Sequence, residues 1–175
     1  MTLRPIDPSS GQADPVNAKS PSPLRKLTLA APPEPGTLQV AFASKDRTHV
    51  DQHFGAAEGF VLYLADSTHA KLSGVLEFPP ESMDGNENKL SEKIDALRGC
   101  AAVFCLAVGG SAVRQLVQAG IQPMRLDTAE PVENILHTII CGIRDGGVPW
   151  IDKALRAQDS DTARFERMLE EGWQE

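Results

Sequence analysis

The stretch CAAVFCLAVGGSAVRQLVQAG, residues 100–120, predicts a strand that turns directly into a helix. Its first half, 100–108, is a short apolar run bounded by glycines, which is typical of a strand buried on both faces of a sheet. Its second half predicts a helix over 109–120, with Ser111 as a possible N-cap and Gly120 just past the end. A buried strand followed by a helix favours an α/β fold, in which helices pack on a sheet.

Strands precede this unit along the chain. LQVAFAS (38–44) predicts another buried strand, and residues 58–65 and 71–78 predict two more. The DSTHA segment (66–70) between the last two has turn chemistry, so we expect those two strands to form a hairpin. The segment PPESMDGNEN (79–88) predicts a loop.

Helices and one weaker strand complete the pattern. Apolar residues at helical spacing predict helices over 88–99 and 131–144, and IQPMRLD (121–127) predicts a short strand that its proline weakens or moves toward a sheet edge. A short helix from Pro149 and a separate amphipathic helix from about Asp161 are expected at the end. The order of elements resembles the ribonuclease-H-like topology, so we expect a single α/β domain with a mixed five-stranded sheet flanked by helices.

Proline content divides the chain into three regions. Residues 1–36 contain eight of the thirteen prolines and cannot bury enough apolar surface to offset the entropy of ordering them. We therefore expect a disordered tail over 1–36, a ligand-binding domain over 37–148 and a helical extension over 149–175.

Composition indicates a soluble protein with an acidic body. The 175 residues are 41% apolar and 23% charged, with a formal net charge of −7; the first 36 residues carry +1 and the rest −8. Nucleic-acid affinity comes mainly from Lys and Arg that neutralise phosphates, so we expect no nucleic-acid partner. The sequence has no apolar run of about 18 residues and no visible secretory signal, so we expect a cytoplasmic protein without membrane spans and with reduced cysteines.

Candidate binding residues follow two of the predicted strands. In an open α/β sheet, ligands gather at the carboxyl ends of parallel strands. The loop after strand 38–44 contains Arg47 and the run His53-Phe54-Gly55, while Cys105 lies near the end of strand 100–108. If the two strands are parallel neighbours, these segments lie side by side. Cys100 lies roughly 16 Å further back, at about 3.3 Å per residue, so geometry favours Cys105 as the partner of His53.

Each of these residues also has a simpler interpretation. A histidine in a polar loop is often solvated or bonded to backbone, and a free cysteine is commonly a small core residue. Together, imidazole and thiolate suit iron, zinc or copper, so His53 and Cys105 are candidate metal ligands. The chain has no C-x-x-C motif, which argues against a closed zinc site or a protein-built iron–sulfur cluster.

The turn Gly109-Gly110-Ser111 is a candidate anion site. Backbone N–H groups at a helix N-terminus attract negative charge, although the glycines could serve only the strand-to-helix turn. Arg47, Lys45 and Arg114 could add positive charge nearby. Enzyme chemistry has weak support, because the strand 38–44 contains no acid for a Mg²⁺ site and no Ser-His-Asp or Cys-His spacing is distinguishable.

Several separated stretches resemble the NifX group of nitrogenase cofactor-biosynthesis proteins, in order and at family-like spacing. They are LQVAFAS (38–44), VDQHFGAAEGFVLY (50–63), GNENKLSEKIDALRGCAAVFCLAVGGSAVRQLVQAGIQPM (85–124) and VPWIDKAL (148–155). The resemblance covers about residues 38 to 156 and says nothing about either end of the chain.

This resemblance implies a ribonuclease-H-like domain that is not an enzyme. It implies a carrier whose transient cargo is an iron–sulfur precursor of the iron-molybdenum cofactor (NifB cofactor) or the finished iron-molybdenum cofactor. The precursor would be accepted from the cluster synthase NifB and passed to the NifEN scaffold. The family's HFG motif falls on His53, Phe54 and Gly55, and its glycine-serine turn on Gly109, Gly110 and Ser111. The motif does not decide between Cys100 and Cys105. An alternative is a regulatory protein that docks on assembly factors without carrying a cluster.

Overall fold

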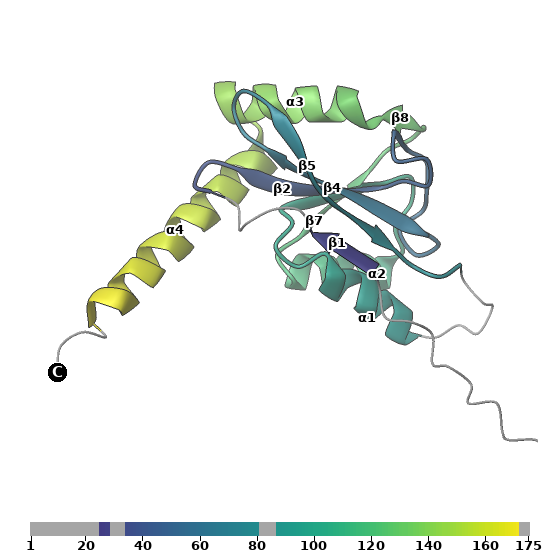
Figure 1. Cartoon of the computed structure of the whole chain (residues 1–175), viewed down its shortest axis with the longest axis horizontal. Helices are drawn as coiled ribbons and strands as arrows, with labels where there is room; N and C mark the ends of the chain where they lie inside the picture. The colour runs from purple at the N-terminus through teal and green to yellow at the C-terminus, as the bar shows by residue number, and fades with distance from the viewer. Residues whose placement is uncertain (1–24, 29–33, 81–86, 172–175) are drawn as a thin grey trace, which may run out of the picture.

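The computed structural model describes residues 25–28, 34–80 and 87–171. Figure 1 shows a central sheet with helix α3 on one face and helices α1 and α2 on the other. The strands of the main sheet are β1 (Arg25–Thr28), β2 (Leu38–Ala43), β4 (Gly59–Ala65), β5 (Ala70–Glu77), β6 (Ala102–Cys105) and β7 (Gln122–Arg125). The helices are α1 (Glu87–Ala96), α2 (Gly110–Gln118), α3 (Val132–Asp145) and α4 (Pro149–Glu171).

The main sheet is mixed and has the order β1-β5-β4-β2-β6-β7. Strands β2, β4 and β5 are successive antiparallel neighbours, while β6 and β7 continue the sheet in parallel from β2. The five strands from β5 to β7 confirm the predicted ribonuclease-H-like arrangement. Strand β7, which contains the proline of the weak prediction, lies at the edge of the sheet, where a missing N–H costs least.

Two apolar clusters on opposite faces of the sheet form the core. One packs α1 and α2 against residues such as Phe54, Phe60 and Val103, and the other packs α3 and the start of α4 against Val40 and Phe104. The side chains of β2 and β6 alternate between the two clusters, and every residue of β6 is buried. The prediction of a strand buried on both faces is therefore confirmed.

Strand β1 was not predicted. It pairs antiparallel with β5, from Arg25 opposite Glu77 to Thr28 opposite Gly74. It lies inside the range 1–36 that the proline content assigned to a disordered tail, so that prediction fails for these four residues. The segment RKLT contains no proline, so every residue has a backbone N–H for strand pairing. By pairing with β5, it covers an edge of that strand. The rest of the tail up to residue 33 and most of the predicted 79–88 loop lie outside the described residues.

Two smaller predictions were also wrong, and one small element was not predicted. Residues 149–171 form one continuous helix instead of two, because no glycine or proline interrupts them after Pro149. Helix α2 is capped by Gly109 without a side-chain hydrogen bond, so Ser111 is inside the helix and is not its N-cap. A separate two-stranded ladder pairs β3 (His49–Val50) with β8 (Glu130–Pro131). None of the described helices is long and apolar enough to cross a membrane.

Candidate functional site

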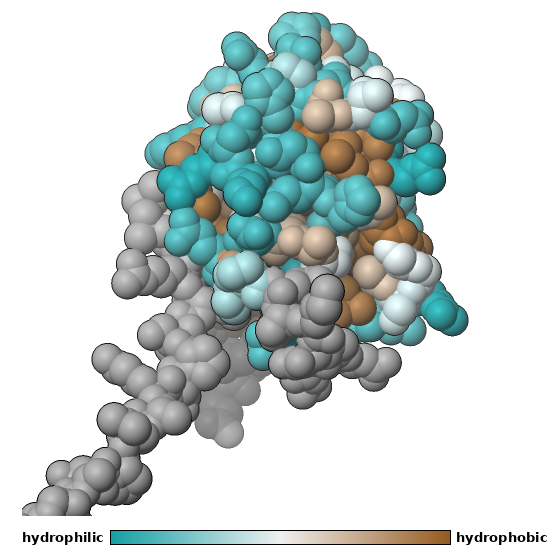
Figure 2. Space-filling view, turned by 90° about the vertical axis from the view of Figure 1, so that its right-hand side faces the viewer, coloured by the Kyte–Doolittle hydropathy of each residue, from teal (hydrophilic) through white to brown (hydrophobic). Residues whose placement is uncertain are grey.

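The candidate site lies at the end of the sheet where β2 and β6 finish. These strands are parallel neighbours, with Val40 opposite Ala102 and Phe42 opposite Phe104, so their carboxyl ends lie at the same edge. The expected juxtaposition of the segments that follow them is confirmed. Figure 2 views this end of the molecule, which presents mainly hydrophilic surface broken by hydrophobic patches.

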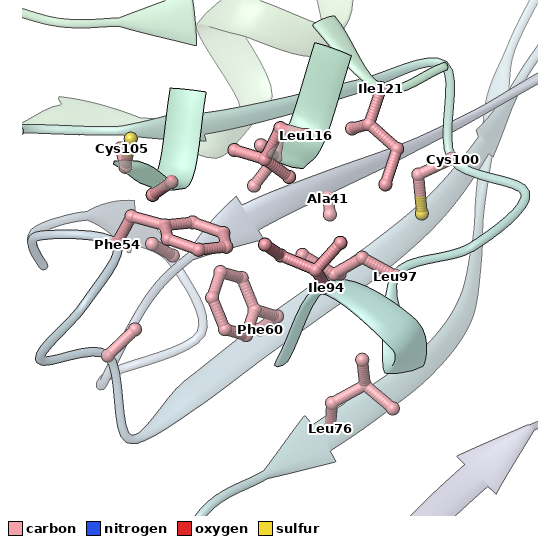
Figure 3. Packing of buried hydrophobic residues seen from close by; sticks show 14 of the residues in the cluster. Ala41, Phe54, Phe60, Leu76, Ile94, Leu97, Cys100, Cys105, Leu116 and Ile121 are labelled. Atoms are coloured by element: carbon pink, nitrogen blue, oxygen red, sulfur yellow. The ribbon is translucent and has the colours of Figure 1, made fainter. Parts of the chain in front are cut away.

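Backbone hydrogen bonds fix the loop after β3 to the segment after β6. The amide of Leu106 donates to the carbonyl of Gln52 at 3.0 Å, and the amide of Phe54 donates to the carbonyl of Ala107 at 2.8 Å. The Phe54 side chain is fully buried and packs on Phe60, with ring centroids 5.6 Å apart (Figure 3). Phe54 thus anchors the loop in the core.

His53 lies between these two fixed positions, and its side chain is exposed. The residues on both sides have their backbone carbonyl or amide bound to the 106–107 segment, so the imidazole is presented to solvent from a held backbone. Gly55 is exposed too, and a side chain added there would meet nothing within 4 Å. The space on the side of Gly55 where a Cβ would point is therefore open, which leaves room for a ligand to approach.

Lys93 of α1 is a site residue that the sequence interpretation missed. Its side chain is 3% exposed, and its ammonium donates a hydrogen bond to the carbonyl oxygen of Gly55. The same ammonium lies 5.8 Å from the centroid of the Phe78 ring. A buried lysine is uncommon and indicates a specific role. The signal was available in the sequence, because Lys93 follows Leu90 by three residues and precedes Leu97 by four, on the apolar face of the helix.

Cys105 lies beside the loop but faces the core. It is fully buried, its sulfur is 3.9 Å from the Met124 carbonyl oxygen, and burial raises the pKa of the thiol to about 11, an effect that the backbone N–H of Phe54 partly opposes. The structure therefore brings together the backbones around His53 and Cys105, with one side chain in solvent and the other in the core. Cys100 is also buried, at the far side of the same cluster in Figure 3.

The glycine turn gives α2 an exposed N-terminus. Gly109, Gly110 and Ser111 are exposed, and the first turn contains no acidic residue. Added side chains at either glycine would meet nothing within 4 Å, so neither close packing nor a positive φ requires these glycines. The Ser111 hydroxyl accepts a hydrogen bond from Gln115 at 3.2 Å. The backbone N–H groups of this turn are available to an anion.

The expected basic residues near the loop are paired with acids. Arg47 contacts Glu77 at 2.6 Å, and Lys45 lies 3.5 Å from Glu58. These four side chains line a shallow hollow of about 350 Å³ at the same sheet end. Because each cation has a carboxylate partner, the hollow is close to neutral rather than basic. An anion entering it would have to compete with Glu58 and Glu77.

His49 belongs to a structural turn. The Asp46 carboxylate accepts hydrogen bonds from the amides of Thr48 and His49, both at 2.8 Å, and pairs with the His49 ring at 2.8 Å. These hydrogen bonds hold the pKa of Asp46 well below its ordinary range, and the bond from the Thr48 amide has the largest effect. Over the part of the chain that the structure describes, no three His, Cys, Asp or Glu side chains converge as a metal site.

The fold and the site define a class of small α/β protein in which a docked loop presents one histidine at the end of a mixed sheet. Comparison with known proteins places the chain more closely. The family model described as dinitrogenase iron-molybdenum cofactor matches residues 37–142, so the chain belongs to this family.

Two curated relatives are similar in sequence to most of the chain. It is 42% identical over 156 residues to protein NifX of Azotobacter vinelandii, which covers 88% of this chain and 99% of that protein. It is 35% identical over 137 residues to protein NifX of Klebsiella pneumoniae, covering 77% and 83%. A 99-residue part, 55% of the chain, is 34% identical to 20% of the cofactor biosynthesis protein NifB of Bradyrhizobium diazoefficiens. The resemblance to the NifX group is confirmed, and the protein's role lies in iron-molybdenum cofactor biosynthesis for nitrogen fixation.

Proposed function

We propose that this protein is a non-catalytic, cytoplasmic carrier for an iron–sulfur precursor of the iron-molybdenum cofactor. It accepts the precursor, NifB cofactor, from a NifB-type cluster synthase and delivers it to a NifEN-type scaffold. The observation that carries the proposal is the exposed imidazole of His53 on a loop that the core holds in place.

The arrangement suits cargo that must leave again. An imidazole is a good ligand for iron, and one exposed ligand on a fixed backbone costs little conformational entropy on binding. The free N–H groups at Gly109, Gly110 and Ser111 would support the negative charge of a cluster at the same sheet end. Few protein bonds to the cargo would keep its release to a scaffold fast.

Cys105 has a smaller part in this proposal than its strand-end position implied. A fully buried thiol with a raised pKa stays protonated at neutral pH, whereas a metal ligand must be a thiolate. For Cys105 to join His53 on a cluster, the Phe54 anchor would have to move and uncover the sulfur. His53 is therefore the primary ligand of the proposal, and Cys105 would act only in an opened loop.

An anaerobic retention assay tests the carrier function. Protein is mixed with NifB cofactor and passed through gel filtration, and absorption and iron content are measured on the protein fraction. We expect wild-type protein to retain the cluster and His53→Ala to lose most of it. The matched control is His69→Ala, because His69 is exposed in the β4–β5 turn at the opposite end of the sheet. Equal iron in the wild type and His53→Ala would refute the proposal.

One observation favours a second function, docking on nitrogenase assembly factors without cargo. The far part of α4 projects away from the sheet in Figure 1 and exposes Phe165, Met168 and Leu169 at 63%, 63% and 50%. Apolar side chains at this spacing form one face of a helix, which is a common way to bind a groove in another protein. If His53→Ala supports full cofactor maturation while truncation of α4 abolishes it, this second function replaces the first.

A further inference from the structure

The outer face of α3 carries a group of side chains that the proposed carrier site does not use. The helix packs on the sheet through Val132, Ile135, Leu136 and Ile139, which leaves the other side to solvent. On that side His137 and Cys141 are one helical turn apart, and the His137 Nδ1 lies 3.9 Å from the Cys141 Sγ.

Cys141 differs from the other two cysteines of the chain. Cys100 and Cys105 are buried at 4% and 0% exposure, while Cys141 is partly exposed. It is therefore the cysteine whose sulfur can reach a solute without any change in the core. A sulfur and an imidazole nitrogen facing each other at the surface form a pair of soft to intermediate ligands.

The separation of the two ligand atoms fits a single metal ion. Zinc bonds are about 2.3 Å to sulfur and about 2.0–2.1 Å to imidazole nitrogen, so ligand atoms up to roughly 4.4 Å apart can reach one ion. The 3.9 Å between Nδ1 and Sγ lies within this limit. Both residues are on the same rigid helix, so the ion can bind without any movement of backbone.

A charged pair, Arg144 and Asp145, lies beside the Cys141 sulfur. An Nη2 of Arg144 lies 3.6 Å from the Cys141 sulfur and donates toward it. The guanidinium is itself held by Asp145, through contacts of 2.8 and 3.0 Å to the two carboxylate oxygens. Because the Asp145 carboxylate neutralises the guanidinium, it offsets the repulsion between Arg144 and a bound cation. Such outer contacts commonly tune metal ligands.

We propose that His137 and Cys141 form a second metal site, which binds one divalent transition-metal ion of the Zn²⁺, Co²⁺ or Fe²⁺ class. The site has two protein ligands, and water completes the coordination of the ion. It is separate from the His53 loop, because α3 covers a face of the sheet, whereas the loop lies at its end. The inference does not depend on the carrier function and would stand if that function failed.

A cobalt titration of the full chain tests the site. Co²⁺ is added anaerobically, and thiolate-to-cobalt charge-transfer absorption in the near ultraviolet is recorded. We expect one equivalent of cobalt to produce the band, and Zn²⁺ to displace it. Cys141→Ser and His137→Ala should each lose the band, while His53→Ala and His69→Ala keep it. All four positions are at least partly exposed, so circular dichroism and thermal unfolding should match the wild type.

The result can contradict the proposal in four ways. Wild-type protein could give no thiolate band, Cys141→Ser could leave the band unchanged, or His137→Ala could leave the affinity for cobalt unchanged. Loss of the band in His53→Ala would also overturn it, because the ion would then belong to the sheet-end loop.

Discussion

Two exposed regions of this protein are built in opposite ways. The loop around His53 is polar at its surface, but Phe54 and Lys93 anchor it in the core from below. The far part of α4 exposes apolar side chains and contributes no residue to either core cluster beyond Leu155. The loop can hold a chemical group at a fixed position, whereas the helix can only offer a surface. Substitutions in the two regions should therefore have very different effects on stability.

The largest effect is expected from Phe54→Ala. The phenyl ring is fully buried among Phe60 and its neighbours, and emptying such a position typically costs about 3–5 kcal/mol of unfolding free energy. Urea unfolding followed by circular dichroism measures this cost. A loss below about 1 kcal/mol would mean that the loop is not anchored as described.

Lys93→Met should come second. The methionine can fill the same volume but removes the hydrogen bond that the charged ammonium donates to the Gly55 carbonyl, and hydrogen bonds of charged groups typically contribute about 1.5–3 kcal/mol. Cluster retention should fall as well, because the His53 backbone loses a support. Lys93→Arg, which keeps a donor, is the matched control, and it should recover more of the retained iron than Lys93→Met does. Equal retention in the two variants would show that Lys93 does not position the loop.

Cys105 should make stability depend on alkaline pH. Its pKa is raised in the folded state to about 11 from an ordinary value of 9, so ionisation favours the unfolded chain. The contribution of the protonated Cys105 thiol to the free energy of unfolding is fully present below pH 9 and is lost as the pH rises through 11. Cys105→Ala should flatten this decline between pH 9 and 11, measured as thermal midpoints, even though it lowers stability at neutral pH. If the thermal midpoint of Cys105→Ala fell as steeply with pH as that of the wild type, a group other than Cys105 would be responsible for the decline.

Phe165→Ala should have the smallest effect. The ring is 63% exposed, and substitutions at exposed positions usually change stability by no more than about 0.5 kcal/mol. It is the direct counterpart of Phe54→Ala, with the same atoms removed from the other region. A loss of more than about 1 kcal/mol would mean that this part of α4 packs against something within the chain. Loss of maturation without loss of stability would instead support docking through α4.

Much of the fold followed from sequence patterns. The apolar runs at 38–44 and 100–108 predicted two buried strands, the DSTHA turn predicted a hairpin, and helical spacing predicted α1, α2 and α3. Strand β1 escaped prediction because its partner, among the residues that the structure describes, is the edge of β5 some fifty positions away. We predicted two helices where α4 is a single one, because its middle is polar. No glycine or proline after Pro149 interrupts the helix.

The candidate site was predictable in place but less so in detail. The rule for strand ends placed the His53 loop beside the segment after β6, and the structure confirms that placement. A strand buried on both faces implied that Cys105 is buried, whereas a role as metal ligand requires an accessible sulfur, and the residues alone did not decide between the two. The burial of Lys93 could have been predicted from its place on the apolar face of α1, but its contact with Gly55 could not, because that contact joins residues 38 positions apart.

The sequence by itself determined the class of fold, the loop that carries His53 and the family, because these depend on local periodicity and on motifs that survive in the order of residues. Tertiary structure alone decided which side chains of those motifs meet solvent. It put His53 outside and Cys105 inside, paired Arg47 with Glu77, and joined His137 to Cys141 on the outer face of α3. A local pattern indicates which face of a helix or strand is buried, but the exposure of a single side chain in a loop or at the end of a strand depends on what packs against it from elsewhere in the chain.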